Sequence, residues 1–246
     1  MSTQTQQQFV AEIRAYCAAH ANEALARKYA RYFKEGYDAW GLLDSKHEFW
    51  TVKEPEWRER HARMGLKGFL KLGEDLFSSG KYEEGALAIR FVKGYGRDFG
   101  RDGLPGLAKW FASGIRNWAH TDVLCGEILT PALVDGRIGL SDLAPWRASK
   151  YPFQRRAVPV TMLGLLKKPF PARELLDFVA PLMPDGERVV HQGLGWFLRE
   201  TWKKQPAPVE AFLLEWKETA ARLIFQYATE KMTAAQKARF KREGKR

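Results

Sequence analysis

A tryptophan and an aspartate stand four residues apart in the stretch NWAHTDVLCG, residues 117–126. Positions i and i+4 of a helix share a face, so Trp118 and Asp122 would present an indole and a carboxylate side by side. Each has an ordinary alternative, because a helical tryptophan usually packs in the core and a carboxylate in a first turn can accept from free amides. Together they also suit a ligand that is or becomes cationic, which makes the pair a candidate site.

Two further candidates recur in the same periodic pattern. Four helices are predicted to begin at regular spacing, near Tyr82, Trp118, Phe153 and Val190. These starts differ by 36, 35 and 37 residues, and Arg156 and Trp196 are the fourth and seventh residues of the last two helices. At about 100° per residue, Trp118, Asp122 and Arg156 fall within an arc of roughly 100°, with Trp196 about 60° beyond Arg156. Whether the four side chains meet depends on how the helices are rotated relative to one another, and this rotation cannot be inferred from the sequence.

The elements that must position these residues are predicted to be helical. Apolar residues recur at spacings of three and four along most of the chain, and stretches rich in Gly, Pro, Asp or Ser separate them. The nearest strand candidate, VPVT at 158–161, is short and contains a proline. We therefore predict an all-α chain. A period near 36 residues is typical of an α-solenoid of stacked helix pairs with a concave surface, although an ordinary helical bundle can give the same spacing.

Composition limits the classes of partner. The 246 residues carry a net charge of +11, which favours a polyanion such as nucleic acid or an anionic membrane surface. Six of these excess charges lie in residues 231–246, a basic tail that either grips phosphates or forms a solvated, partly frayed helix. Two cysteines are too few for a disulfide framework, and no secretory signal or membrane span is visible. We expect a cytoplasmic protein.

Several familiar sites are excluded by their spacing. The five histidines form no pair at i, i+4 around a glutamate, and with two distant cysteines they predict no metal site. The glycine-rich stretch GYGRDFG at 94–100 follows a predicted helix and lacks a phosphate-loop lysine, so we expect a turn between helices. No GxSxG motif is present, which argues against an α/β-hydrolase.

Four segments resemble the AlkD-like DNA alkylation-repair glycosylases, a family built from HEAT-like helical repeats. The matching segments are ARYFKEGYDAWGL at 30–42, NWAHTDVLCGEIL at 117–129, FQRRAV at 153–158 and GLGWFLRETWKK at 193–204. The last is the most specific, since it reproduces the family's GWxLRE helix. The similarity extends over about residues 10–225. It implies a single HEAT-like repeat domain at 1–230, followed by the basic tail at 231–246.

The resemblance also implies a function. Asp122 occupies the position of the family's catalytic aspartate, with Trp118 and Trp196 as aromatic partners, and Arg156 that of a phosphate-contacting arginine. Tyr32 matches an aromatic residue of the family, and Lys203 and Lys204 can hold phosphates. The expected protein is a monofunctional DNA glycosylase for N3- or N7-alkylated purines, a monomer that needs no metal or other cofactor and binds double-stranded DNA containing alkylated bases on its concave surface.

The chain differs from the family's usual pattern at four positions, and two alternative functions remain to be tested. Residues Ala119, His120, His191 and Gln192 differ from the usual pattern and border the candidate site, which bears on substrate range. One alternative is a DNA-binding protein of the same fold that recognises DNA structure without catalysis. The other is a protein-binding scaffold, a common role of helical repeats. Binding to duplex DNA that weakens with salt separates the scaffold from the first two functions.

Overall fold

The computed structural model describes residues 3–42 and 44–243, and within these ranges the chain is all-α, as predicted. Their one β-type pairing is an isolated bridge between Asp38 and Lys81. The chain divides into two compact units, residues 1–128 and 129–246, and each unit is described by itself. The prediction of a single domain over residues 1–230 stays a prediction.

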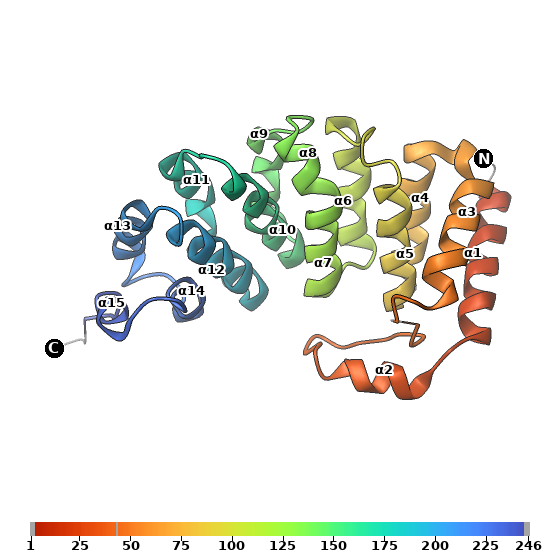
Figure 1. The fold of residues 1–246 in the computed structure, drawn as a ribbon, viewed down its shortest axis with the longest axis horizontal. Helices are drawn as coiled ribbons and strands as arrows, with labels where there is room; N and C mark the ends of the chain where they lie inside the picture. Colours follow the sequence, from red (N-terminus) through yellow and green to blue (C-terminus); the bar gives the residue numbers. More distant parts are fainter. Residues whose placement is uncertain (1–2, 43, 244–246) are drawn as a thin grey trace. The chain divides into compact units, whose positions relative to one another are not determined.

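The first unit begins with two helices and continues as a series of helix pairs. Its elements are α1 (Thr3–Ala19), α2 (Glu23–Ala30), the π-helical turn η1 (Phe49–Lys53), α3 (Glu54–Arg60), the 3₁₀ turn η2 (Ala62–Met64), α4 (Gly65–Ser78), α5 (Tyr82–Lys93), η3 (Arg101–Gly103), α6 (Leu104–Ser113) and α7 (Trp118–Leu124). The π-helical segment η4 (Cys125–Leu129) follows α7. Helices α3, α5 and α7 pack in one row, and α1, α4 and α6 in a second (Figure 1).

A glycine and a large aromatic side chain bring neighbouring helices of the second row together. A Cβ atom at Gly73 of α4 would lie 2.4 Å from the indole of Trp110 on α6, so these helices approach through the missing side chain. The same indole is fully buried and donates from Nε1 to the carbonyl of Leu70 at 2.8 Å. Burial of a large aromatic ring with its N–H satisfied stabilises this contact.

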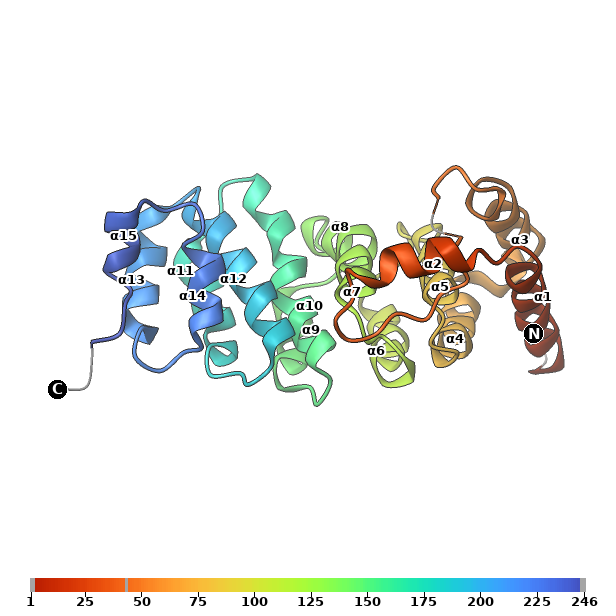
Figure 2. The same cartoon turned by 90° about the horizontal axis from the view of Figure 1, so that it is seen from below.

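Helix α2 differs from the other helices of the first unit. It contains no buried residue, and the segment that follows it passes the amino-terminal ends of α5 and α7 (Figures 1 and 2). The isolated bridge between Asp38 and Lys81 joins this segment to the turn that precedes α5. Tyr32, in the same segment, lies beside the start of α7, where its backbone carbonyl accepts from the indole of Trp118.

The second unit repeats the paired arrangement. Its elements are α8 (Thr130–Val134), α9 (Leu140–Leu143), the 3₁₀ segment η5 (Ala144–Ala148), α10 (Pro152–Met162), η6 (Leu163–Lys167), α11 (Ala172–Val179), η7 (Ala180–Leu182), α12 (Arg188–Trp202), α13 (Pro206–Trp216), α14 (Arg222–Ala228) and α15 (Ala234–Ala238). Helices α10, α12 and α14 pack in one row, and α11 packs on α13. A Cβ atom at Gly195 of α12 would lie 2.8 Å from the carbonyl oxygen of Ile224, so glycine permits the close contact with α14.

The predicted helix starts are close to the observed ones. Helices α5 and α7 begin at Tyr82 and Trp118 as predicted, α10 begins one residue earlier at Pro152, and α12 begins two residues earlier at Arg188. The weak strand candidate at 158–161 is helical and lies inside α10, where all four of its residues are buried. Tertiary burial overrides its β-branched composition. The glycine-rich stretch at 94–100 forms the expected turn after α5.

The described part of the basic segment packs against the rest of the second unit. Phe240 is only 1% exposed and Met232 only 5%. Thr233 caps α15 through a capping box, and the guanidinium of Arg242 donates to the carbonyl of Ala220 at 3.0 Å. Residues 231–243 are therefore held by apolar and polar contacts. Residues 244–246 of the basic tail lie outside the described ranges.

No helix in the described part of the chain has both the length and the apolar character that crossing a membrane requires.

Candidate functional site

Helix α7 begins where Asn117 caps it. Asn117 has an extended backbone, with φ −141° and ψ 156°, and its side-chain oxygen accepts from the amide of His120 at 2.8 Å. An asparagine in this position satisfies one of the free amides of the first turn. Trp118 is consequently the first helical residue, and Asp122 follows one turn later on the same face. Trp118 is 39% exposed and Asp122 is half-buried.

The segment after α2 holds the indole of Trp118. Its Nε1 donates to the backbone carbonyl of Tyr32 at 3.2 Å, and the ring stacks on Phe33 with centroids 5.7 Å apart and planes 16° apart. Phe33 covers one face of the indole, so a ligand can contact only the part of the ring that Phe33 leaves exposed. The side chain of Tyr32 is 52% exposed, and its hydroxyl accepts from the guanidinium of Arg31 at 2.9 Å. The structure thus brings Tyr32 and Trp118 together.

A buried carboxylate anchors the other end of this segment. Glu83, in the first turn of α5, is fully buried and accepts three backbone amides, from Trp40 at 2.8 Å and from Gly41 and Leu42 at 2.8 and 2.9 Å. The backbone of Gly41 has φ +85°, and a Cβ atom there would lie 2.0 Å from the carbonyl oxygen of Asn22. Only glycine fits this close, left-handed turn.

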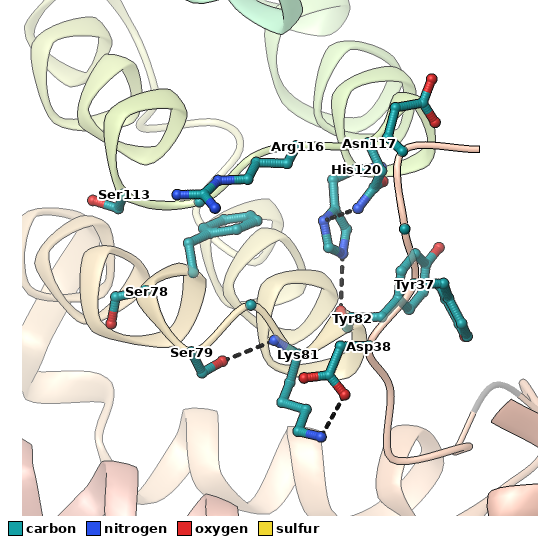
Figure 3. Close-up of a pocket in the computed structure, with 15 residues that line it drawn as sticks. Tyr37, Asp38, Ser78, Ser79, Lys81, Tyr82, Ser113, Arg116, Asn117 and His120 are labelled. Carbon is teal, nitrogen blue, oxygen red and sulfur yellow. Dashed lines mark hydrogen bonds and ion pairs between the residues drawn. The ribbon is translucent and has the colours of Figure 1, made fainter. Parts of the chain in front are cut away.

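His120 belongs to the first turn of α7, and it is only 3% exposed. Its ring stacks on Tyr82 at 4.5 Å between centroids, and its two nitrogens bond to Asn117 and to the carbonyl of Tyr82 (Figure 3). Burial lowers the pKa of His120 to about 4, and burial likewise raises the pKa of Tyr82 to about 12. Both rings are therefore uncharged at neutral pH.

A cavity of about 410 Å³ opens beside these residues. It lies among the turn before α5, the turn before α7 and the loop at residues 35–38, and Figure 3 shows Arg116 and Lys81 among the side chains that line it. Lys81 pairs with Asp38 at 2.5 Å, and Glu35 lines the cavity as well. Two cations and two carboxylates balance, so this cavity does not select for an anion.

A second hollow of about 490 Å³ runs along α3, α5 and α7. Its floor includes Ile89, and Val123, which follows Asp122, borders it with 46% of its surface exposed. The cations on its wall are largely paired, since Arg58 contacts Glu54 at 3.0 Å and Lys93 contacts Glu127 at 2.6 Å.

The remaining candidates lie in the second unit. Arg156 of α10 is 6% exposed, and its guanidinium donates to the carbonyl of Val189 at 2.9 Å. A Cβ atom at Gly193 of α12 would lie 3.0 Å from Cγ of Arg156, so the arginine packs across that glycine. Trp196, one turn further along α12, is half-buried. Little of the Arg156 side chain is therefore open to solvent for a phosphate contact.

The two lysines are at the end of α12. Lys203 is the C-cap residue and pairs with Glu200 at 2.6 Å, and Lys204 follows it; both are exposed. Cations near a helix carboxyl terminus interact favourably with its dipole, which is a structural role that does not require DNA. In the described part of the chain, no group of three or more His, Cys, Asp or Glu residues could hold a metal ion.

The structure groups the seven candidates by unit. It brings Tyr32 and Trp118 into direct contact and sets Asp122 one turn away, and it places Arg156, Trp196 and the two lysines on α10 and at α12. Convergence of both groups on one ligand stays a prediction. Sequence reasoning missed Phe33 and Glu83, whose partners are distant in sequence, and saw His120 only as a departure from a pattern.

Comparison with known proteins adds one finding. The model of a protein family described as DNA alkylation repair enzyme matches residues 13–232, a range that contains all seven candidate residues. No curated protein matches the chain.

Proposed function

This chain belongs to the family of DNA alkylation repair enzymes, and from that premise we propose that it is a monofunctional DNA glycosylase. Its substrates are N3- and N7-alkylated purines of the 3-methyladenine and 7-methylguanine type in duplex DNA. It acts as a monomer without a metal or another cofactor. The proposal contains no lyase step, because no lysine is assigned as a Schiff-base nucleophile.

The chemistry of the lesion suits the side chains of α7. A purine alkylated at N3 or N7 is positively charged, so it leaves with the electrons of the N-glycosidic bond as a neutral base and needs no protonation. The sugar then acquires oxocarbenium character, which a carboxylate stabilises electrostatically. Water adds to the anomeric carbon and gives its proton to the carboxylate of Asp122 or to solvent, which leaves an abasic sugar.

One observation carries the proposal: Asp122 and the part-exposed Trp118 share one face of α7 in a chain of this family. The indole can contact the cationic nucleotide at the ring surface that Phe33 leaves open, worth about 0.5–2 kcal/mol depending on desolvation. The carboxylate lies one helical turn from that ring, on the scale of the distance between a base and its sugar.

Contacts to the DNA backbone are assigned to the remaining candidates. Tyr32 and the two exposed lysines, Lys203 and Lys204, offer a hydroxyl and ammonium groups to phosphates. Arg156 is assigned a phosphate through the small exposed part of its side chain, and Trp196 an aromatic contact to the nucleotide.

Release of free base from methylated duplex DNA tests the proposal. The wild-type protein is expected to release 7-methylguanine, measured by chromatography. Asp122→Asn is expected to lower the single-turnover rate by about 10²- to 10³-fold, because a neutral amide does not stabilise the cationic sugar. DNA affinity should change little, since the carboxylate acts on the transition state.

Asp135→Asn is the matched control, an identical change at an exposed aspartate that pairs with Arg137. Equal rates for Asp122→Asn and the wild-type protein contradict the role of Asp122. Salt-sensitive duplex binding without base release supports the non-catalytic DNA-binding alternative, and the absence of duplex binding supports the protein scaffold.

A further inference from the structure

The imidazole of His120 connects the first turns of two helices. One ring nitrogen, Nε2, lies 2.8 Å from the carbonyl oxygen of Tyr82, the first residue of α5, and the other, Nδ1, lies 2.9 Å from the side-chain nitrogen of Asn117, the cap of α7 (Figure 3). The ring also lies nearly perpendicular to the ring of Phe77 on α4, with centroids 5.3 Å apart. One buried side chain of α7 therefore contacts the cap of its own helix, the neighbouring helix α5 of the same row, and α4 of the other row.

Its protonation state follows from the bonds around it. The side-chain oxygen of Asn117 accepts from the amide of His120, so its nitrogen faces Nδ1 and donates to it. Nδ1 is then the acceptor, and Nε2 carries the proton that is donated to the Tyr82 carbonyl. Both ends of the asparagine amide and both ring nitrogens are satisfied by a single arrangement.

The neighbouring helix leaves space for this ring. A Cβ atom at Gly85 of α5 would lie 2.7 Å from Cε1 of His120 and 2.6 Å from the ring of Phe77. Contacts below 3.0 Å require something to move, so the imidazole occupies space that is available only beside a glycine. The fit fixes how closely the first turn of α7 approaches α5.

We infer that His120 is a positioning residue that sets the rotation and height of the first turn of α7, and through it the indole of Trp118 and the carboxylate of Asp122. Trp118 and Asp122 are two residues before and after His120, about 200° around the helix, so they point away from the side that His120 fixes. A rotation of this turn moves both together. The catalytic consequence rests on the proposed function.

Three substitutions distinguish the contributions of the two hydrogen bonds that the imidazole makes. His120→Leu removes both bonds, His120→Gln retains a donor that can reach the Tyr82 carbonyl, and His120→Asn retains an acceptor close to Asn117. Thr121→Val is the control, because the buried hydroxyl of Thr121 bonds only within its own helix, to the carbonyl of Asn117 at 3.0 Å. That change keeps the shape of a neighbouring buried residue and leaves the contact with α5 intact.

Two measurements are made on each variant. The first is the single-turnover rate of 7-methylguanine release, together with the affinity for the same DNA. The second is the ¹⁹F NMR resonance of Trp118 in protein labelled with 5-fluorotryptophan, assigned by its disappearance in Trp118→Phe.

The Leu variant is expected to lose about 10- to 100-fold in single-turnover rate while its DNA affinity changes little, because small displacements of catalytic groups cost rate. Its Trp118 resonance should shift or split. The Gln variant should recover most of the rate and the wild-type resonance, the Asn variant should recover less, and Thr121→Val should match the wild type.

The inference is overturned if His120→Leu keeps both the wild-type rate and the wild-type Trp118 resonance, or if Thr121→Val loses as much rate as His120→Leu. A wild-type protein that releases no base disproves the proposed function separately. The Trp118 resonance still decides the positioning role in that case: an unchanged resonance in the Leu variant disproves it, and a shifted one that Gln restores supports it.

Discussion

The buried imidazole of His120 links the stability of the first unit to pH. Its pKa is lowered from 6.5 to about 4 by burial, so between these values the unfolded chain binds a proton that the folded chain does not. Stability therefore falls as pH decreases through this window. With these two pKa values the loss from pH 7 to pH 5 is about 2 kcal/mol, measured by urea denaturation at each pH.

The comparison that isolates this effect is His120→Leu at the same pH values. The variant is less stable at pH 7, because it leaves the side-chain nitrogen of Asn117 without its partner. It should nevertheless lose about 2 kcal/mol less than the wild type on going to pH 5. Parallel pH dependence in the two proteins would show that another group carries the effect.

At the residue scale, the sequence predicted how side chains are placed where the interacting residues are close together in the chain. The spacing of Trp118 and Asp122 predicted their shared face of α7, because helical geometry alone decides it. The supports of Trp118 could not be predicted in this way. The carbonyl of Tyr32 comes from 86 residues away, and His120 bonds to a carbonyl 38 residues away. Such contacts depend on tertiary packing, which periodicity does not encode.

At the scale of elements, the segment from Tyr32 to Leu42 depends on one buried carboxylate. Glu83→Gln places an amide nitrogen where an oxygen accepts a backbone amide in the wild type, and it also removes the charge that strengthens all three bonds. We expect the free energy of unfolding to fall by about 1–3 kcal/mol. Hydrogen exchange at the amides of residues 40–42 should accelerate more than in the helices, since these amides lose their acceptor.

Glu35→Gln serves as its control, the same chemical change at an exposed position of the same segment. It should alter neither the unfolding free energy nor exchange at residues 40–42. Exchange that stays slow in Glu83→Gln would mean that contacts other than the carboxylate hold the segment.

Helix boundaries were predictable to the extent that caps and breakers mark them. Asn117 precedes α7 and a Gly-Lys turn precedes α5, and both predicted starts are confirmed. Helix α10 begins one residue before its predicted start because Pro152 occupies the first helical position, where its missing N–H costs nothing. Pro159 counted correctly against a strand at 158–161, and inside α10 the burial of its neighbours outweighs the hydrogen bond that it does not donate.

The GLGWFLRE stretch also contains a purely structural residue. Gly195 of α12 meets α14 so closely that a Cβ atom would lie 2.5 Å from Cβ of Tyr227. Gly195→Ala is expected to lower the free energy of unfolding by about 1–3 kcal/mol through overpacking. Thermal denaturation measures this loss against Gly186→Ala, a glycine of the same unit with nothing within 4 Å of the added atom. Equal melting temperatures for the two variants would contradict a tight contact between α12 and α14.

For the whole molecule, the family predicted from four short segments is confirmed by the match over residues 13–232. The all-α class is confirmed within the described ranges, because dense helical periodicity with few strand signals leaves little alternative. Charge was less informative. The sequence contains 40 Lys and Arg residues, but many contact carboxylates, such as Arg155 with Asp185 and Lys217 with Glu243. Net charge alone therefore does not locate a DNA-binding surface.

The dependence of DNA affinity on salt can locate it. Each phosphate contact that is lost should reduce the slope of log affinity against log salt by about 0.9 for duplex DNA. Because Lys203 and Lys204 are both assigned to phosphates, the double variant Lys203→Gln/Lys204→Gln should reduce the slope by about 2. Lys71→Gln on α4, at an exposed lysine paired with Glu74, is the control and should leave the slope unchanged.

The same measurement tests whether the basic segment, residues 231–246, grips phosphates. Phe240 is buried and Arg242 bonds to a backbone carbonyl, so truncation would disturb the fold as well as the charge. Replacing the exposed Lys237 and Lys241 by glutamine removes two charges and keeps these contacts. If the segment grips phosphates, the slope falls by about 2. If the segment does not contact phosphates, the slope equals that of the wild type, and the phosphate contacts lie elsewhere on the chain.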